Sequence, residues 1–597
     1  MDKKRTMNTY GKMLIVYVCY LLTALLAIGQ IVRLQFFSDY RDQLDAIVYR
    51  TIEIPAYRGS ILGYDGRVLA STVPFYEIRM DCQVPDDMLL NSSLDDLALA
   101  LSRFFGDKSA AAYEQEILQA RLQKKPGYRN LPIGNRLVSH DELQKIREFP
   151  VFDKGQYLGG LIAKEKEKRI YPYGRLAYRT IGYISDDERS GVGIEYAYNS
   201  YLKGYPGQQR VRRRSGDDKW VPLSSRPEVD PKDGLDVIST LDINIQEAAE
   251  NALREQLSLD DTFEGATTVV MEVETGAVRA IVNMKRMKDG SYDETFNYAI
   301  SQSTNPGSTF KLATLIALLE DGYVRLSDSV ETGKNGWRYY GKTFTEAGRS
   351  YGTITVQQAF EKSSNVAFAK LAVEKYGDKE KQYINRLYNM KLNEKLNIEL
   401  IGEGRASIPF PGEPGWSGLS LPMIAMGYEM QLTPLHVLTF YNAIANNGKM
   451  VTPYFIESFM QHGRTIEEFS HTPLSGTLCS PSTLKAVHKA LRGVVENGTA
   501  AGINDPRYSI SGKTGTAQIA YDGAYVHDGY RKHQASFVGF FPSQAPKYSM
   551  IVILYSGPTR SNFYGASWAA PVFKKIADHI YITNPFWSQP LGAPEKT

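Results

Sequence analysis

The hydrophobic pattern of the chain begins with an uninterrupted apolar run near the N-terminus. Residues 13–32 (MLIVYVCYLLTALLAIGQIV) carry no charged side chain, and about 20 such residues form a helix long enough to cross a bilayer. A cleaved signal peptide is the alternative, because Ala27-x-Gly29 resembles a cleavage site. The run continues past that point through Ile31 and Val32, which favours an uncleaved transmembrane helix.

A second region covers residues 33–235. It starts with a mixed-charge segment (33–50) that predicts a helical continuation. From residue 51 short β-like runs alternate with many glycines and prolines, and a polar, helical interlude lies near 90–150. The pattern predicts a mixed, β-rich domain.

A third region begins near residue 236 and mixes strands with helices. The segment 266–284 predicts two strands around a turn, and 511–521 and 547–557 predict further strands. Helices such as 308–320 lie between them. Strands at both ends of a region with helices in the middle indicate an antiparallel sheet covered by helices, which is an α+β fold.

The charges before the apolar run predict its orientation. Lys3, Lys4, Arg5 and Lys12 precede it, and the positive-inside rule then leaves the tail in the cytoplasm and the bulk of the chain outside. The predicted parts are a cytoplasmic tail (1–12), a transmembrane helix (13–32), a β-rich domain (33–235), an α+β domain (236–585) and a Pro-rich flexible tail (586–597).

Composition narrows the classes of function. Of 597 residues 23% are charged and 43% hydrophobic, as in ordinary folded proteins, and a net charge of +3 gives no case for nucleic acid. The eight histidines are scattered and no Cys/His cluster has metal-ligand spacing, so we expect no metal. Cys19 lies in the apolar run, so Cys82 and Cys479 could form one disulfide at most.

One short motif brings a hydroxyl and an amine together. In NPGSTFKLATL (305–315), Pro306 suits the first position of a helix and Asn305 suits its cap. Ser308 then lies in the first turn, where free backbone N–H groups favour negative charge. Lys311, three residues later, returns to the same face. The pair is a candidate nucleophile with a candidate base.

Two further motifs make this one specific. Ser363-Ser364-Asn365 follows it, and Lys513-Thr514-Gly515 comes later with Thr516 directly behind. S-x-x-K, a serine–asparagine motif and K-T-G in this order are typical of serine β-lactamases and penicillin-binding proteins.

The order also excludes two chance matches. Ser482–Lys485 repeats the S-x-x-K spacing but falls after the serine–asparagine motif instead of before it. Ser303-Thr304-Asn305 matches S-x-N but directly precedes Ser308, where helix capping explains it.

The residue types suit attack on an amide. No histidine lies near the motifs, so Lys311 is the candidate base, and it can serve as one only if desolvation and a nearby cation lower its pKa. Lys513 can be that cation and can attract a substrate carboxylate. Ser363 offers a proton relay to the leaving amine, and Asn365 can hydrogen-bond a substrate amide and Lys311.

The third motif also offers backbone and hydroxyl groups. Gly515 lets the strand approach a ligand closely. The backbone N–H groups of Ser308 and Thr516 are candidates for an oxyanion hole. The hydroxyls of Thr514 and Thr516 could hold a carboxylate.

Beyond these motifs the chain resembles the class B penicillin-binding proteins, membrane-anchored D,D-transpeptidases of bacterial cell-wall synthesis, over nearly its whole length. Gly63 departs from the family, which usually has aspartate there. The segment 426–436 is more similar to division-type than to elongation-type members. The segments that carry the resemblance are RGSILGYDGRVLA (58–70), RIYPYGRLAYRTIGY (169–183), GVGIEYAYNSYLKG (191–204), MGYEMQLTPLH (426–436) and HQASFVGFFP (533–542).

The resemblance implies a function and partners. Residues 33–235 would be a pedestal or dimerisation-like domain, and 236–585 a transpeptidase domain. Ser308 would attack the penultimate D-Ala of a stem peptide ending in D-Ala-D-Ala, release D-Ala, and pass the acyl group to an amine on a neighbouring strand. β-Lactams would acylate the same serine, and no cofactor is implied. The expected setting is the bacterial cytoplasmic membrane, with a polytopic glycan polymerase and divisome membrane proteins as partners.

Several alternatives stay beside this interpretation. An elongation-type role and a D,D-carboxypeptidase side activity use the same residues. A β-lactamase would need neither anchor nor pedestal, and no acidic glycosyltransferase motif precedes residue 236. A non-catalytic septal scaffold or a β-lactam sensor is the alternative from another class; the intact motifs disfavour the scaffold, and the absence of further signalling segments disfavours the sensor.

Overall fold

The computed structural model describes residues 2–36, 49–123, 130–185, 187–213, 220–346, 348, 350–469, 473–519, 525–559 and 563–584. Contacts within the chain divide it into two compact units. They are Met1–Arg58 with Lys203–Gly234, and Gly59–Leu202 with Leu235–Thr597.

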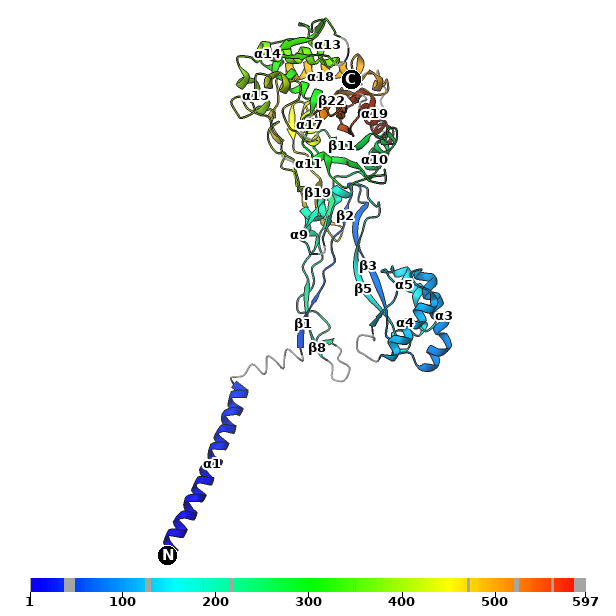
Figure 1. The fold of residues 1–597 in the computed structure, drawn as a ribbon, viewed down its shortest axis with the longest axis vertical. Coiled ribbons are helices and arrows are strands. Elements are labelled where there is room, and N and C mark those ends of the chain that lie inside the picture. The colour runs from blue at the N-terminus through cyan, green and yellow to red at the C-terminus, as the bar shows by residue number, and fades with distance from the viewer. Residues whose placement is uncertain are drawn as a thin grey trace. The chain divides into compact units, whose positions relative to one another are not determined.

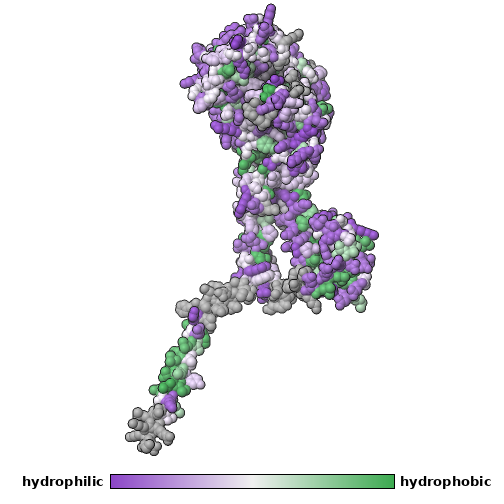
Figure 2. All heavy atoms as spheres, viewed as in Figure 1, coloured by the Kyte–Doolittle hydropathy of each residue, from purple (hydrophilic) through white to green (hydrophobic). Residues whose placement is uncertain are grey.

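The first unit contains a long apolar helix and a small sheet. Helix α1 (Asp2–Phe36) includes a 25-residue stretch, Thr9–Arg33, that is long and apolar enough to span a membrane and is exposed throughout (Figure 2). The predicted continuation over 33–50 is helical only to Phe36; residues 37–48 lie outside the described part. Strands β1 (Tyr49–Ile54), β8 (Gly207–Arg213) and β9 (Trp220–Pro222) form a sheet in the order β1-β8-β9.

In the second unit a long antiparallel pair of strands, β3 and β5, leads to a small helical cluster (Figure 1). Helices α3, α4 and α5 pack there around their own core, which includes Leu97, Tyr113 and Ile117. Ser139 and Glu142 form a capping box at the start of α5. The bounds are β3 (Val68–Met80), α3 (Asp87–Phe105), α4 (Ala110–Leu122), β4 (Leu131–Pro132), α5 (His140–Arg147), η2 (Phe152–Lys154), α6 (Gly155–Leu158) and β5 (Leu161–Ile170).

Three of the segments that carry the family resemblance, 58–70, 169–183 and 191–204, meet at one buried ion pair. Arg169 donates from Nε to Glu195 at 2.7 Å, and from Nη1 to the carbonyl of Gly59 at 2.7 Å and to Thr72 at 3.1 Å. Glu195 is only 1% exposed. A Cβ on Gly59 would lie 2.0 Å from the Leu235 carbonyl oxygen, so only glycine fits there. Segments 58–70, 169–183 and 191–204 are therefore fastened to one another. The Ser60 N–H also donates to Asp236 Oδ1 at 2.7 Å, at the start of the third region.

The third region is built on a six-stranded antiparallel sheet in the order β13-β12-β11-β24-β23-β22. This confirms the predicted α+β architecture and the strands within 266–284, 511–521 and 547–557. The bounds are β11 (Phe263–Glu272), β12 (Val278–Arg286), β13 (Tyr292–Asp293), β22 (Ser511–Ile519), β23 (Lys532–Phe541) and β24 (Tyr548–Ser556).

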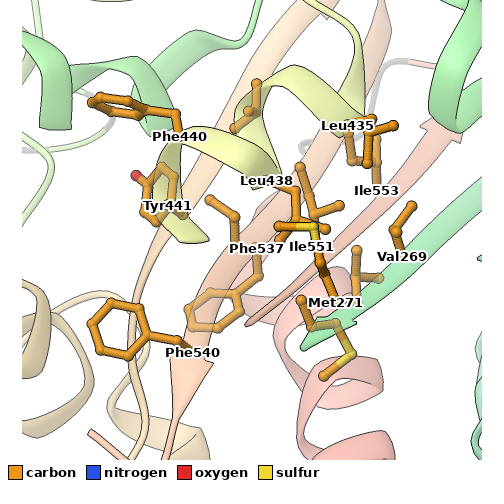
Figure 3. Packing of buried hydrophobic residues seen from close by; sticks show 14 of the residues in the cluster. Val269, Met271, Leu435, Leu438, Phe440, Tyr441, Phe537, Phe540, Ile551 and Ile553 are labelled. Atoms are coloured by element: carbon orange, nitrogen blue, oxygen red, sulfur yellow. The ribbon is translucent and has the colours of Figure 1, made fainter. Parts of the chain in front are cut away.

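Helices cover both faces of this sheet. On β23, Phe537 and Phe541 contact Phe573 of α19, whereas Phe540, which points to the other face, contacts His488 of α18. Helix α17 packs on the face of α18, with its apolar side chains against those of β11 and β24 (Figure 3). The bounds are α10 (Ile243–Leu257), α17 (Pro434–Ala445), α18 (Pro481–Glu496) and α19 (Gly565–Thr583).

The remaining elements are short connections and the helices around the predicted motifs. In the first part of the unit they are β2 (Ile61–Leu62), α7 (Tyr178–Ile181), β6 (Tyr183–Ile184), β7 (Gly191–Val192), α8 (Gly193–Ala197), α9 (Asn199–Leu202) and β10 (Asp236–Ser239). Further on they are α11 (Tyr298–Ser301), η3 (Gly307–Phe310), α12 (Lys311–Glu320), β14 (Ser329–Glu331), β15 (Trp337–Tyr339), β16 (Lys342–Phe344), β17 (Thr353–Thr355), α13 (Val356–Glu361), α14 (Asn365–Tyr376), α15 (Glu380–Asn389), α16 (Ser420–Ala425), β18 (Lys449–Val451), β19 (Ile456–Gln461), β20 (Arg464–Glu468), β21 (Pro473–Thr477) and η4 (Ala501–Ile503).

Candidate active site

Ser308 lies in the short 3-10 turn η3, which leads directly into α12. The predicted cap by Asn305 is wrong: no side chain caps the turn, and Asn305 Oδ1 accepts from the Met430 backbone at 3.3 Å. Instead the Gly307 N–H donates to the Gly427 carbonyl at 3.0 Å. A Cβ on Gly427 would lie 2.1 Å from the Gly307 oxygen. Close backbone packing against residues 427–430 therefore holds the serine in place.

The two chance matches to the motifs, Ser303–Asn305 and Ser482–Lys485, have other contacts. Ser303 donates to the Arg405 carbonyl at 2.8 Å and Thr304 to Gln534 at 2.8 Å, so these side chains do not cap the turn as expected. Ser482 and Lys485 border a separate surface hollow that contains neither of the other two motifs.

Lys311, three residues after Ser308 at the start of α12, is completely buried. Its Nζ donates to the Ser363 carbonyl at 2.7 Å, to Asn365 Oδ1 at 2.7 Å and to Ser363 Oγ at 3.3 Å. Burial lowers the pKa of Lys311 to about 7, and the negative charge of Glu346 acts in the opposite direction. The structure thus brings the first two motifs together around an amine that can exist uncharged at neutral pH.

Ser363 has a backbone conformation that serine rarely adopts, with φ at +56°. Its N–H donates to the Phe360 carbonyl and that of Ser364 to the Ala359 carbonyl, which is the Schellman pattern that ends many helices. Glycine is usual at this position, after the last turn of α13. Here a serine occupies it, and both its carbonyl and its hydroxyl reach Lys311.

Asn365 is the first residue of α14, and a carboxylate holds the start of that helix. Glu346 accepts the Ser364 hydroxyl with Oε1 and the Asn365 N–H with Oε2, the latter at 2.9 Å. The Ser364 hydroxyl in turn caps the Ala367 N–H at 3.0 Å. The Asn365 side chain is then directed to Lys311.

Lys513 lies fully buried on β22. Burial, and after it the charge of Lys311, hold the pKa of Lys513 well below its ordinary value. Its Nζ donates to the Thr514 carbonyl at 3.0 Å and lies 5.7 Å from the centre of the Phe360 ring. The predicted second cation is therefore close to the first and feels its charge, but the lowered pKa of Lys311 itself is due to burial.

The other residues of the third motif have neighbours of their own. Thr514 shares a hydrogen bond of 2.6 Å with Thr499, and Thr516 Oγ1 accepts the N–H of Gly565, the first residue of α19, at 3.3 Å. A Cβ on Gly515 would lie 2.3 Å from Ser536 Oγ and 2.9 Å from Thr309 Cγ2. Glycine is required here because the turn η3 and strand β23 pack against it, whereas the sequence suggested only the approach of a ligand.

A pocket of about 650 Å³ joins these groups. Lys311 donates to two of its lining residues, Ser363 and Asn365, and Lys513 directly precedes a third, Thr514. Six of the eight predicted residues line it directly: Ser308, Ser363, Asn365, Thr514, Gly515 and Thr516.

Sequence reasoning missed several lining residues. Glu346 and Thr499 belong to loops and have no motif around them, so no signal in a single sequence identifies them. His533, 6% exposed, stacks on Phe563 with ring centres 6.0 Å apart. Burial, and after it the charge of Arg531, lower the pKa of His533.

Comparison with known families identifies both large regions. The profile described as "Penicillin binding protein transpeptidase domain" matches residues 266–578, and that described as "Penicillin-binding Protein dimerisation domain" matches residues 53–238.

Similar proteins extend over nearly the whole chain. The probable peptidoglycan D,D-transpeptidase PenA of Neisseria gonorrhoeae is 25% identical over 593 residues, covering 96% of this chain and 93% of its own length. The peptidoglycan D,D-transpeptidase FtsI of Escherichia coli is 25% identical over 577 residues, covering 95% of this chain and 90% of its own. The stage V sporulation protein D of Bacillus subtilis is 25% identical over 478 residues, 77% of this chain and 70% of its own.

Solved structures share the fold. Penicillin binding protein 2X from Streptococcus thermophilus superposes with a TM-score of 0.71 at 18% identity, covering 91% of this chain and 81% of that one. Penicillin binding protein 3 from Mycobacterium tuberculosis, in its complex with aztreonam, gives a TM-score of 0.63 at 22% identity, covering 91% of this chain and 99% of that one.

Proposed function

The chain belongs to the penicillin-binding protein transpeptidases, as a class B member of the division type, and we propose that Ser308 is the serine through which it cross-links peptidoglycan stem peptides. The enzyme is a D-Ala-D-Ala transpeptidase of cell-wall synthesis that binds β-lactams. One observation carries the assignment of the serine. The buried Lys311 donates to Ser363 and Asn365 of the second motif, and these two residues line the same pocket as Ser308.

Acylation needs the proton of Ser308 to leave as its oxygen attacks the carbonyl carbon of the penultimate D-Ala. Lys311 receives it in the uncharged form. All three of its present contacts are donated by Nζ. The bond to Ser363 Oγ is the longest of them. When Lys311 gives up one proton to become uncharged, losing this weakest hydrogen bond costs the least free energy. The Ser363 hydroxyl can then turn to donate to the free amine.

The same serine connects the base with the leaving group. As the C–N bond breaks, the departing amine of D-Ala needs one proton, and Ser363 can pass it on from the newly charged Lys311. In the second half-reaction an acceptor amine of a neighbouring strand loses its proton along the reverse route and takes the acyl group. Water in place of that amine would give a carboxypeptidase side reaction.

The third motif would bind the negative charge of the substrate. We assign the terminal carboxylate of the donor peptide to Lys513, Thr514 and Thr516. The low pKa of Lys513 supports this assignment, because an arriving carboxylate would stabilise the charged ammonium. The backbone N–H groups of Ser308 and Thr516 would form the oxyanion hole for the developing negative charge.

Helix α1 anchors the enzyme to a membrane. We assign it to the bacterial cytoplasmic membrane as a single pass, with the catalytic domain on the extracytoplasmic side, on the strength of the basic residues before it and of the FtsI-like relatives. A septal role, with a polytopic glycan polymerase and divisome membrane proteins as partners, follows from the same likeness.

Covalent labelling of the detergent-solubilised full chain with a fluorescent penicillin tests the nucleophile. We expect the parent to be labelled and Ser308→Ala to remain unlabelled. Ser482→Ala, in the second copy of the S-x-x-K spacing, is the matched control and should label like the parent. Labelling of a folded Ser308→Ala protein would place the nucleophile elsewhere, and rapid loss of the adduct from the parent would favour a β-lactamase.

A further inference from the structure

Glu346 lies outside every sequence motif, yet it holds one of them. It follows β16 by two residues and lines the same pocket as Ser308. Its two carboxylate oxygens accept from the Ser364 hydroxyl and the Asn365 N–H. Both donors belong to the second motif, at the start of the 12-residue helix α14.

These two bonds fix the part of the chain that contacts the base. Ser363 and Asn365, on either side of Ser364, supply all three acceptors of the Lys311 Nζ. Ser363 is held in the left-handed region, a conformation that serine retains only where its surroundings impose it. A carboxylate that binds the next two residues is a direct source of that constraint.

Glu346 also acts on Lys311 through its charge. The negative charge comes from the loop after β16 and opposes the effect of burial on the pKa of Lys311, whereas the nearby Lys513, on β22, has its own pKa lowered by burial and by Lys311. Lys362 also borders the pocket with its own charge, and among the described residues the other titratable lining groups are Tyr351, Tyr428, His533 and Tyr564. Glu346 is therefore the negative partner of the base in this part of the chain.

We propose that Glu346 is a positioning residue of the reaction: it holds the Ser363–Asn365 segment against Lys311 and supplies the negative charge that keeps Lys311 a strong enough base for Ser308. This inference rests on the proposed function, since it gives Glu346 a role only if Lys311 receives the proton of Ser308.

The effect of removing the charge has a definite sign. Burial lowers the pKa of Lys311 to about 7 and Glu346 raises it against that effect. Without the carboxylate the pKa falls further. Since the uncharged amine is the active form, the rise of the acylation rate with pH should then occur at lower pH. The plateau should also fall, because a weaker base is a poorer proton acceptor.

The experiment is the pH dependence of the second-order rate of acylation by a fluorescent penicillin, measured from pH 5 to 9 on the solubilised full chain. In Glu346→Gln we expect the rise to move to lower pH and the plateau to fall about tenfold, because one charged hydrogen bond is lost. Glu346→Asp keeps the charge, so its rise should stay where the parent has it while its plateau falls. Glu346→Asp also keeps the test decisive if Glu346→Gln does not fold.

A matched control exists in the same domain. Glu320 accepts the N–H and the hydroxyl of Ser480, the cap of α18, much as Glu346 does for α14, but it lies at the far end of α12 from Lys311. Glu320→Gln should therefore keep the parental profile. Three results would overturn the proposal. The first is a folded Glu346→Gln whose acylation rate rises at the same pH as in the parent. The others are a pH shift in Glu346→Asp or in Glu320→Gln as large as that in Glu346→Gln. Failure of the proposed function would be seen separately, as no labelling of the parent at any pH.

Discussion

At the scale of single residues, Ser363 adopts a strained backbone conformation that places its side chain at the site. The position after α13 favours glycine, and a side chain with φ at +56° costs about 1 kcal/mol or more. The serine is nevertheless placed there, where its carbonyl and hydroxyl both contact Lys311. The conformation brings the relay to the base, and the hydroxyl is the only part of the side chain that contacts the amine.

This separates stability from activity in one substitution. Ser363→Gly should raise the free energy of unfolding by up to about 1 kcal/mol, because glycine adopts this conformation without strain. It should slow penicillin acylation by about 100-fold or more, because the proton relay is lost. Ser363→Ala is the control: it should lose activity equally and gain no stability. Chemical denaturation and acylation rates measure the two effects, and equal stability of the two variants would contradict the strain argument.

The candidate base was predictable in kind from the sequence. Three motifs in order identified Lys311 and Lys513, and chemistry required one of them to lose its proton easily. Glu346 could not be predicted, since an isolated glutamate in a loop carries no pattern. Its contacts with Ser364 and Asn365 depend on how β16 and α14 pack.

At the scale of elements, the strands were predictable and the cap was not. Apolar runs such as 266–284 predicted β11 and β12 because both faces of that sheet are covered by helices. The cap at Asn305 failed because residues 427–430, far away in sequence, provide the partner instead. Local rules assume that a helix end satisfies itself, whereas this one is satisfied by tertiary packing.

The position of η3, the turn that contains Ser308, should therefore be sensitive to substitutions at the contact between Gly307 and Gly427. Gly427 has φ at +88° and no space for a Cβ, which would lie 2.1 Å from the Gly307 oxygen. Gly427→Ala should displace the turn and lower the acylation rate by about 100-fold, since small misplacements of a reacting group cost this much. Gly415 has φ at +97°, and a Cβ added there would meet nothing within 4 Å. Gly415→Ala should thus show the backbone strain alone.

The two variants are compared by thermal unfolding and by acylation rate. Both should lose stability, Gly415→Ala by about 1–2 kcal/mol from strain alone and Gly427→Ala by more. Only Gly427→Ala should lose acylation. Equal acylation in both would mean that the packing of the two glycines does not position Ser308.

At the scale of the whole molecule, the two large regions differ in what their sequence patterns encode. In the catalytic region short motifs define chemistry, and the structure gathers them at one pocket. In the β-rich region the familiar segments 58–70, 169–183 and 191–204 carry no reactive constellation. Their common feature is physical: Gly59, Arg169 and Glu195 meet at a buried ion pair.

That ion pair should matter for stability and little for chemistry. Arg169→Ala removes the ion-pair partner of Glu195, which is 1% exposed, and breaking a buried pair in this way costs about 3–5 kcal/mol. Penicillin acylation of the folded protein should stay within about twofold of the parent, because distant sites without shared partners act independently. Lys108→Ala removes half of an exposed pair with Glu116 and should cost no more than about 1 kcal/mol.

Far-UV circular dichroism on heating reports the stability, and labelling at a temperature where each variant is folded reports the site. Replacing both partners, as Arg169→Met with Glu195→Leu, should recover part of the loss, because no charge is then left buried. If folded Arg169→Ala failed to label, the β-rich segments would control the pocket, and their role would extend from holding the fold to setting the activity of Ser308. If the double variant were no more stable than Arg169→Ala, the lost hydrogen bonds to Gly59 and Thr72, and not the broken ion pair, would account for the cost.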